Sequence, residues 1–435
     1  MSAIARYFKF KGMAVSGYDR TPSPLTGELC SEGIPVHFDD NPSLVPSDPE
    51  QTLVIYTPAV PETLQELQYV KQNGYKVVKR SKALGEIAAG QTCLAVAGTH
   101  GKTTTSTLVA HILTEGCNGC SAFLGGISKN YGTNMLMSHT PTVVAEADEF
   151  DRSFLQLHPT IAAITAMDAD HLDIYGDLAH VQEAFRQFAS QVSETLILKH
   201  GCPIRQEEVS AHIFTYHYND PGADFHATNI KLDADGHCTY DLVYPAGVLT
   251  DIRVGTLGWI NVENSIAAAA ICLCYGADGQ KVRHAIGTFE GARRRLDEKV
   301  NKSGLTYLDD YAHHPAELES AISSIRGMFP GRKVTGVFQP HLYTRTRDFA
   351  PEFARALSGL DKLILLDIYP AREEKIEGVD SFLILKDVTC PEKQLLHKED
   401  LMEYLRSEPL DVLVTFGAGD IDRFVEPITE MLLAR

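Results

Sequence analysis

The chain has 435 residues, a length that corresponds to about three domains of ordinary size. It carries 39 Lys and Arg against 57 Asp and Glu, which gives a formal net charge of −18, and 44% of its residues are hydrophobic. This composition is typical of a soluble globular protein and excludes global disorder. The negative charge argues against general nucleic-acid binding, which needs a basic surface.

Short apolar runs alternate with amphipathic helical segments along most of the chain, a pattern that predicts an α/β fold with mostly parallel sheets. In residues 1–80 we predict an opening helix, strands at 14–16 and 53–57, and a helix at 62–73. In residues 81–296 we predict strands at 93–97, 142–145, 161–165 and 196–198, a more β-like section at 213–254, and helices at 262–273 and 281–288. In residues 297–435 we predict a doubly wound sheet with strands at 305–309, 333–338, 362–367 and 412–415. The three predicted domains have these bounds.

The predicted amino-terminal domain opens inside a helix. A dinucleotide-type fold would place a strand and a Gly-rich turn immediately before that helix. We therefore expect either a differently built domain or a start codon placed too far downstream.

The sequence also predicts no membrane segment and no secretory signal. The longest apolar stretch, residues 266–275, is too short to cross a bilayer, and Arg6, Lys9 and Lys11 interrupt the apolar amino terminus. The nine cysteines are scattered, and only Cys117 and Cys120 are close together. We interpret them as reduced thiols of a cytoplasmic protein, and a redox pair or half of a zinc site is the alternative.

Residues 93–107 read CLAVAGTHGKTTTST, a predicted strand followed by a Gly-rich turn and a helix. Such a turn brings backbone N–H groups and a helix N-terminus to phosphate oxygens. Lys102 would neutralise those oxygens and Thr103 would hold Mg²⁺. Val96 stands where the standard pattern has its first Gly, and a purely structural turn is the alternative. The predicted nucleotide-binding residues here are Gly98, Thr99, His100, Gly101, Lys102, Thr103 and Thr104.

Two further polar groups follow the next predicted strands. Glu146 ends the strand at 142–145, where a carboxylate suits Mg²⁺ beside phosphates, although a solvated strand end is the alternative. His171 follows the strand at 161–165 and would bind a second cation, with a hydrogen-bonded loop histidine as the alternative. The Gly-rich turn, Glu146 and His171 follow three successive predicted strands. This placement favours a single site that binds ATP and Mg²⁺.

Two later segments have the same placement at strand ends. Arg295 is the last of three consecutive arginines and precedes Asp310 in the sequence. We interpret these arginines as a phosphate contact, and a run that simply faces solvent is the alternative. His341 and Arg345 follow the strand at 333–338, and a His and an Arg in one loop suit carboxylate recognition.

Several strings together resemble the Mur ligase family: AGTHGKTTT, EADEFD, DADHLDIYGD, GARRRLD, DDYAHHP, QPHLYTRTRD and FGAGDID. They extend to residue 422 in the family's order, so the resemblance covers nearly the whole chain. It implies a UDP-binding Rossmann-like domain without its first strand and Gly-rich loop, a central P-loop ATPase domain, and a Rossmann-like carboxyl-terminal domain that receives the amino acid. The string DADHLD favours the members that add L-alanine over the relative that adds a tripeptide.

The resemblance also implies roles for residues. Lys102 would hold the β and γ phosphates, Thr103 and Glu146 the first Mg²⁺, and His171 the second. Three residues would contact the nucleotide: Asn264, Arg295 and Asp310. His341 and Arg345 would bind L-alanine and the acyl phosphate. The residues matched to the sugar nucleotide are Gly132, Thr133 and Asn134. The chain departs from the family at Trp259-Ile260, where an Arg-His pair is common, and at Leu342, where an Arg is common.

The implied reaction joins L-alanine to the lactyl carboxylate of UDP-N-acetylmuramate through an acyl phosphate made with ATP, in peptidoglycan precursor synthesis. His341 is the candidate base for the amine. We expect a monomer or weak homodimer with no nucleic-acid or membrane partner. The alternatives are the tripeptide-adding relative, a folylpolyglutamate synthase, a P-loop kinase and a non-catalytic nucleotide-binding module.

Overall fold

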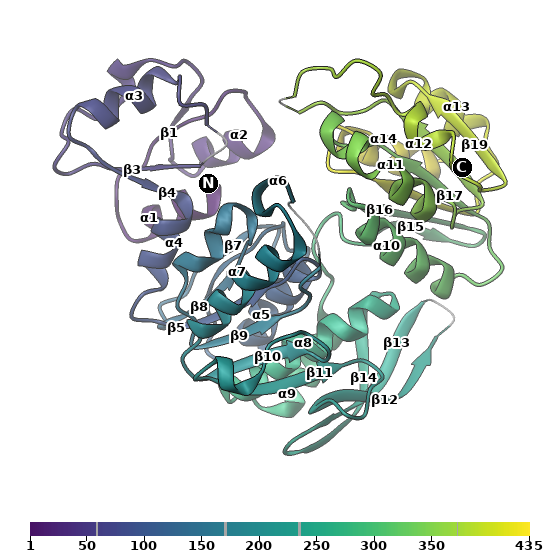
Figure 1. Ribbon diagram of the computed structural model, residues 1–435, viewed down its shortest axis with the longest axis horizontal. Coiled ribbons are helices and arrows are strands. Elements are labelled where there is room, and N and C mark those ends of the chain that lie inside the picture. The colour runs from purple at the N-terminus through teal and green to yellow at the C-terminus, as the bar shows by residue number, and fades with distance from the viewer. Residues whose placement is uncertain (58–59, 169–171, 234–235, 372) are drawn as a thin grey trace. The chain divides into compact units, whose positions relative to one another are not determined.

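The structure is a computed structural model that describes residues 1–57, 60–168, 172–233, 236–371 and 373–435. The chain forms two compact units, each with elements that can be followed in Figure 1. Unit 1 comprises Met1–Ala227, Leu242–Leu249 and Ser265–Ile286, and unit 2 comprises Thr228–Asp241, Thr250–Asn264 and Gly287–Arg435. Of the helices in the described residues, none is both long and apolar enough to cross a membrane.

Unit 1 begins with short elements that form two small parallel sheets, β1-β2 and β3-β4. The bounds are α1 Ser2–Phe10, β1 Gly17–Tyr18, α2 Pro24–Ser31, β2 Val36–His37, β3 Leu53–Tyr56, α3 Gln65–Gln72, β4 Lys76–Lys79 and α4 Arg80–Ala88. The predicted opening helix is confirmed. The strand predicted near 14–16 lies slightly later in the chain, at Gly17–Tyr18, because it is Gly17 that pairs with Val36.

A ten-stranded sheet has the order β14-β13-β12-β11-β10-β9-β5-β8-β6-β7, and its last three strands in the chain contain residues of both units. The strand bounds are β5 Thr92–Ala97, β6 Ser121–Phe123, β7 Met135–Leu136, β8 Thr142–Glu146, β9 Ile161–Ile164, β10 Thr195–Lys199, β11 His212–His217, β12 Phe225–Leu232, β13 His237–Tyr244 and β14 Gly247–Leu257. Strand β5 pairs in parallel with β8 on one side and with β9 on the other. The loops that follow these three strands therefore lie at one edge of the sheet.

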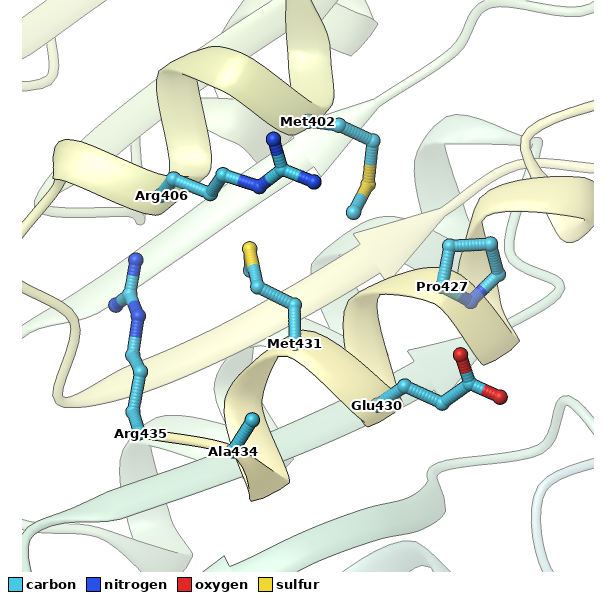
Figure 2. Close-up of a pocket in the computed structure, with 7 residues that line it drawn as sticks. All are labelled: Met402, Arg406, Pro427, Glu430, Met431, Ala434 and Arg435. Atoms are coloured by element: carbon cyan, nitrogen blue, oxygen red, sulfur yellow. The ribbon is translucent and has the colours of Figure 1, made fainter.

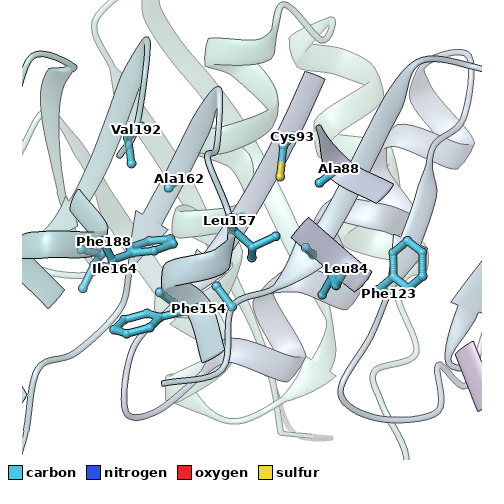
Figure 3. Packing of buried hydrophobic residues seen from close by; sticks show 14 of the residues in the cluster. Leu84, Ala88, Cys93, Phe123, Phe154, Leu157, Ala162, Ile164, Phe188 and Val192 are labelled. Atoms are coloured by element: carbon cyan, nitrogen blue, oxygen red, sulfur yellow. The ribbon is translucent and has the colours of Figure 1, made fainter. Parts of the chain in front are cut away.

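Helices cover the strands of unit 1. The helix bounds are α5 Lys102–Gly116, η2 Phe150–Gln156, α6 Leu172–Tyr175, α7 Leu178–Ser190, α8 Trp259–Tyr275 and α9 Gly279–Thr288. Alternate strand residues such as Cys93 and Ala162 share a core with Leu84 of α4, Phe154 of η2 and Phe188 of α7 (Figure 3). Helix α5 is itself buried over nearly its whole length. The core therefore fixes the end of β5 and the start of α5.

Unit 2 contains a six-stranded sheet in the order β15-β16-β20-β17-β18-β19. Strand β15 is antiparallel to β16, and the remaining pairs are parallel. The bounds are β15 Asp297–Lys302, β16 Leu305–Asp310, α10 Pro315–Met328, β17 Val334–Phe338, α11 Tyr343–Leu357, β18 Lys362–Leu366, α12 Phe382–Leu385, β19 Glu392–Leu396, α13 Leu401–Ser407, β20 Val412–Phe416 and α14 Asp422–Leu433.

Helices cover both faces of this sheet. Leu308 of β16 and Val414 of β20 belong to a core shared with α10, α11 and α12. Their chain neighbours Tyr307 and Leu413 belong to a second core shared with α13 and α14. Strands buried on both faces are the mark of a doubly wound sheet, so the predicted α/β class and the doubly wound carboxyl-terminal sheet are confirmed.

Candidate active site

The Gly-rich turn joins β5 to α5, as the sequence predicts. Gly98 has φ +132° and Gly101, which precedes the helix, has φ +77°. A Cβ atom on Gly98 would lie 2.1 Å from the hydroxyl oxygen of Thr165, so only glycine fits there. The Thr165 hydroxyl donates to the carbonyl oxygens of Ala97 and His100. The turn is therefore held by hydrogen bonds from the residue that follows the neighbouring strand β9.

The ammonium of Lys102 lies inside this turn. Its Nζ atom donates to the carbonyl oxygen of Gly98 at 2.6 Å and lies 2.8 and 2.9 Å from the two carboxylate oxygens of Glu149, a residue only 1% exposed. Burial by itself lowers the pKa of Lys102, but Glu149, and after it Asp148 and Glu146, raise that pKa above its usual value. A positive charge is therefore held where the sequence predicts phosphate.

Glu146, at the end of β8, offers a carboxylate next to α5. One carboxylate oxygen accepts the backbone N–H of Gly125 at 3.0 Å and the hydroxyl of Ser106 at 3.5 Å. Thr103, in the first turn of α5, is buried. Hydroxyl and carboxylate oxygens are ligands that Mg²⁺ prefers, so these two residues fit the predicted ion. His171, the third predicted ligand, lies outside the described residues.

Nucleotide phosphates and water would have to complete such a magnesium site. Among the described residues, no group of three or more His, Cys, Asp or Glu is arranged to hold a metal ion. The pair Cys117 and Cys120 accordingly gives no metal site, and all nine cysteines have free thiols.

The predicted sugar-nucleotide residues lie in the loop between β6 and β7. The N–H of Ser128 donates to the carbonyl oxygen of Thr133, and the N–H of Gly132 donates to that of Ser128, both at 2.9 Å. The Asn134 side chain contacts α1, where its amide oxygen accepts from Arg6 at 3.4 Å. The loop is therefore ordered by its own hydrogen bonds and by the first helix.

Three predicted nucleotide contacts belong to unit 2. The buried Asn264 donates its side-chain N–H to the amide oxygen of Asn261 at 3.0 Å. Arg295 lies 5.3 Å from the ring of Tyr311. Asp310 accepts the backbone N–H of Leu296 at 2.6 Å, and burial raises its pKa to about 6 even though Arg295 acts to lower it. Arg295 and Asp310 thus lie close enough for the charge of one to affect the pKa of the other.

The two residues predicted for the amino acid follow β17. The ring of His341 stacks on that of Tyr369 at 5.7 Å and lies 5.9 Å from that of His313. Arg345 is in the first turn of α11, and its Nη1 atom is buried with no hydrogen-bond partner among the described residues. A buried guanidinium N–H without a partner is costly, so this atom is suited to donate a hydrogen bond to a ligand carboxylate.

Two of the side chains that shape the site were not assigned from the sequence. Glu149 was part of the acidic run after β8, and nothing in that run distinguishes the carboxylate that meets Lys102. Thr165 ends a predicted strand, and its contact with Gly98 depends on the order of the strands. Of the three arginines, Arg294 is structural, because it binds Asp309 at 3.1 Å and the carbonyl oxygen of Gly417 at 2.5 Å.

A pocket of about 510 Å³ lies between α13 and α14 in unit 2 (Figure 2). The side chains of Met402 and Met431 point into it, with Arg406 and Arg435 at one end. No residue predicted to bind nucleotide, metal or substrate lines this pocket. It is therefore separate from the candidate active site.

Comparisons with known proteins agree along the whole chain. Residues 1–92 match the model described as "Mur ligase family, catalytic domain", residues 96–272 the "Mur ligase middle domain", and residues 294–419 the "Mur ligase, glutamate ligase domain". The chain is 48% identical over 440 residues to the UDP-N-acetylmuramate–L-alanine ligase of Porphyromonas gingivalis, covering 99% of this chain and 96% of that protein. It is also 48% identical over 441 residues to the ligase of the same name from Parabacteroides distasonis, covering 99% and 95%.

Solved structures show the same fold. UDP-N-acetylmuramate-alanine ligase from Thermotoga maritima has a TM-score of 0.82 at 24% identity and covers 100% of this chain and 96% of its own. A murein peptide ligase from Psychrobacter arcticus has a TM-score of 0.68 at 19% identity, with 100% and 95% covered. The fold of this chain is thus shared with solved structures of ligases. The chain belongs to the Mur ligase family, as its sequence strings predict.

Proposed function

We propose that the protein is an ATP-dependent ligase that joins L-alanine to the lactyl carboxylate of UDP-N-acetylmuramate in peptidoglycan precursor synthesis. The observation that carries this proposal is the buried, charged Lys102 in a strand–turn–helix loop, because a carboxylate becomes an acceptor for an amine only after phosphoryl transfer. Identity of 48% to ligases of that name supports the choice of substrates.

The first step transfers the γ-phosphoryl group of ATP to a lactyl carboxylate oxygen and releases ADP. Lys102 and the N–H groups of the turn, from Gly98 to Thr104, would hold the phosphate oxygens in place. Mg²⁺, held by Thr103 and Glu146 with a second ion at His171, would neutralise phosphate charge. We assign Asn264, Arg295 and Asp310 to the nucleotide and Gly132, Thr133 and Asn134 to the sugar nucleotide.

In the second step the amine of L-alanine attacks the acyl carbon, and the tetrahedral intermediate expels phosphate. Attack needs a neutral amine, and we assign His341 as the base that accepts its proton. The buried N–H of Arg345 would donate to the carboxylate of L-alanine. This pairing supports an amino acid as the second substrate.

We also propose three domains at residues 1–80, 81–296 and 297–435 and a cytoplasmic location, where ATP and nucleotide sugars are available. The three matching family models, at 1–92, 96–272 and 294–419, support a division into three.

The test is ADP release by the purified chain with Mg²⁺, ATP, UDP-N-acetylmuramate and L-alanine, each omitted in turn. We expect release only when all are present and at least a hundredfold loss in K102M, because the phosphate charge then has no cation in the turn. Release without an amino acid would instead indicate a kinase. Binding of ATP without any release would indicate a nucleotide-binding module, and activity with a tripeptide or glutamate in place of L-alanine would indicate another amide ligase.

A further inference from the structure

Arg6 is a buried charge that the proposed mechanism does not use. It lies in α1, and its side chain is 9% exposed. Its Nε and Nη2 atoms donate to the two carboxylate oxygens of Glu32 at 2.8 and 2.6 Å, and Nη2 also lies 3.2 Å from Glu28. This fork-like pairing fixes the plane of the guanidinium and leaves Nη1 directed at the amide oxygen of Asn134, 3.4 Å away.

The guanidinium determines which way the Asn134 amide points. An arginine has only donors, so the group that faces it must be the oxygen of the amide and not its NH₂. The NH₂ group then points the other way, and one of its N–H bonds is directed at the hydroxyl oxygen of Ser2, 3.3 Å away. Among the described residues, the second N–H of Asn134 meets no acceptor. Asn134 is therefore an oriented hydrogen-bond donor.

The rest of the loop does not need Arg6. The hydroxyl of Tyr131 lies 2.8 Å from Nδ1 of His111 in α5, and backbone hydrogen bonds join Ser128 to Gly132 and Thr133. These contacts hold the loop backbone on the helix that follows the phosphate turn. Within this loop, the contribution of Arg6 is thus confined to the side chain of Asn134.

Arg6 itself is poorly placed to bind an anion. The carboxylates of Glu28 and Glu32 more than balance its single charge, and a phosphate would have to displace them. An indirect role is therefore favoured over direct contact.

We propose that Arg6 is a positioning residue of the sugar-nucleotide site, which turns Asn134 so that its second N–H donates to an oxygen of UDP-N-acetylmuramate. The proposal rests on the proposed function, since it takes the substrate from there. The acceptor is a hydroxyl, carbonyl or phosphate oxygen of that molecule.

The test is a double-mutant cycle on R6M, N134A and R6M/N134A, with KM measured for each substrate in turn. We expect R6M and N134A each to raise KM for UDP-N-acetylmuramate about tenfold and to leave KM for ATP and L-alanine within about twofold. Because Arg6 acts through Asn134, the double variant should equal N134A within about twofold instead of showing a hundredfold effect. R326M, which removes an arginine paired with Asp361 at 2.7 Å in unit 2, is the matched control and should leave all three KM values unchanged.

Multiplied effects in the double variant, or an unchanged KM for the UDP-sugar in R6M, would overturn the proposal. So would an equal rise in all three KM values, which marks a general structural role. E32Q tests the same idea if R6M does not fold, because it frees the guanidinium to rotate and should raise the same KM by a smaller factor. A wild-type chain that neither binds UDP-N-acetylmuramate nor releases ADP would instead refute the proposed function.

Discussion

The buried charge of Lys102 in the candidate site has Glu149 as its salt-bridge partner. Lys102 is surrounded by three carboxylates, yet only Glu149 lies within salt-bridge distance of its ammonium. A buried lysine without a counter-ion loses its proton more readily, because burial disfavours the charged form. The charge that would meet ATP is thus set by a residue that need not touch ATP.

Replacing Glu149 by glutamine should therefore change the pH dependence of the reaction. In E149Q burial is opposed by less negative charge, so the pKa of Lys102 falls and the ammonium is lost at lower pH than in the wild type. We expect kcat/KM for ATP to fall at least tenfold at pH 8 and its alkaline limb to move to lower pH, with partial recovery towards pH 6.5. Initial rates between pH 6 and pH 10 measure this.

Asp148 supplies the control for that experiment. Its carboxylate also raises the pKa of Lys102, but it is not within salt-bridge distance of the ammonium. D148N should therefore move the alkaline limb less than E149Q does. Identical profiles for E149Q and the wild type would show that Glu149 does not set the charge of Lys102.

The sequence predicts Lys102 and leaves Glu149 unassigned for a physical reason. A lysine after a glycine, at the start of a helix, predicts a phosphate site, because such a site is built from the local backbone alone. The partner of that lysine is chosen by the packing of β8 against β5, and the acidic run offers Glu146, Asp148 and Glu149 equally. Local pattern gives the site and tertiary structure gives its counter-ion.

At the scale of elements, the Gly-rich turn is held by the parallel pairing of β5 with β9. Gly98 stands between the end of β5 and Thr165 at the end of β9, with no room for a side chain. The turn would therefore move if any carbon were added there.

G98A should lose nucleotide binding, whereas Gly90 should tolerate the same change to alanine. A Cβ at residue 98 would lie 2.1 Å from the Thr165 hydroxyl and 2.8 Å from two backbone nitrogens, so the turn must shift. We expect at least a hundredfold weaker ATP binding by calorimetry. G90A is the matched control, because Gly90 also has positive φ (+76°) but nothing within 4 Å of its Cβ position. It should cost about 1 kcal/mol of stability and bind ATP normally. Equal ATP affinity in the two variants would contradict this account.

Helices and strands were predicted well where the local sequence pattern determines their position. They were predicted less well where pairing with a distant segment determines it. Strand β5 and the opening helix are apolar or amphipathic over several residues, which identifies them locally. Strand β1 has two residues and exists through pairing with β2, so its position is not visible in its own sequence. Helix α3 starts at Gln65, later than predicted, where Asp40 accepts the N–H groups of Gln65 and Glu66.

At the scale of the molecule, each unit has cores of its own. One large core lies within unit 1, and two cores on the faces of the six-stranded sheet lie within unit 2. Which segments share a core depends on contacts between distant residues, and hydrophobic periodicity does not record those contacts. The doubly wound sheet was nevertheless predictable, since its strands β16, β17, β18 and β20 are buried along their whole length and are rich in apolar residues.

Although β12, β13 and β14 contain residues of both units, each core named above lies within one unit, and we predict from this that the two units unfold separately. The single tryptophan, Trp259, opens α8 in unit 2, and its ring packs against Gly327 of α10, so its fluorescence reports on the contact between α8 and α10. F353A empties part of a unit 2 core and F188A part of the unit 1 core, and each should cost about 3–5 kcal/mol. In urea, F353A should lower the midpoint seen by Trp259 fluorescence. F188A should leave that midpoint unchanged. It should lower the midpoint of a second transition, which far-ultraviolet circular dichroism detects and Trp259 fluorescence does not. If either variant moves both transitions equally, the units unfold as one cooperative body, since a shared transition transmits the loss of any core contact to the whole chain.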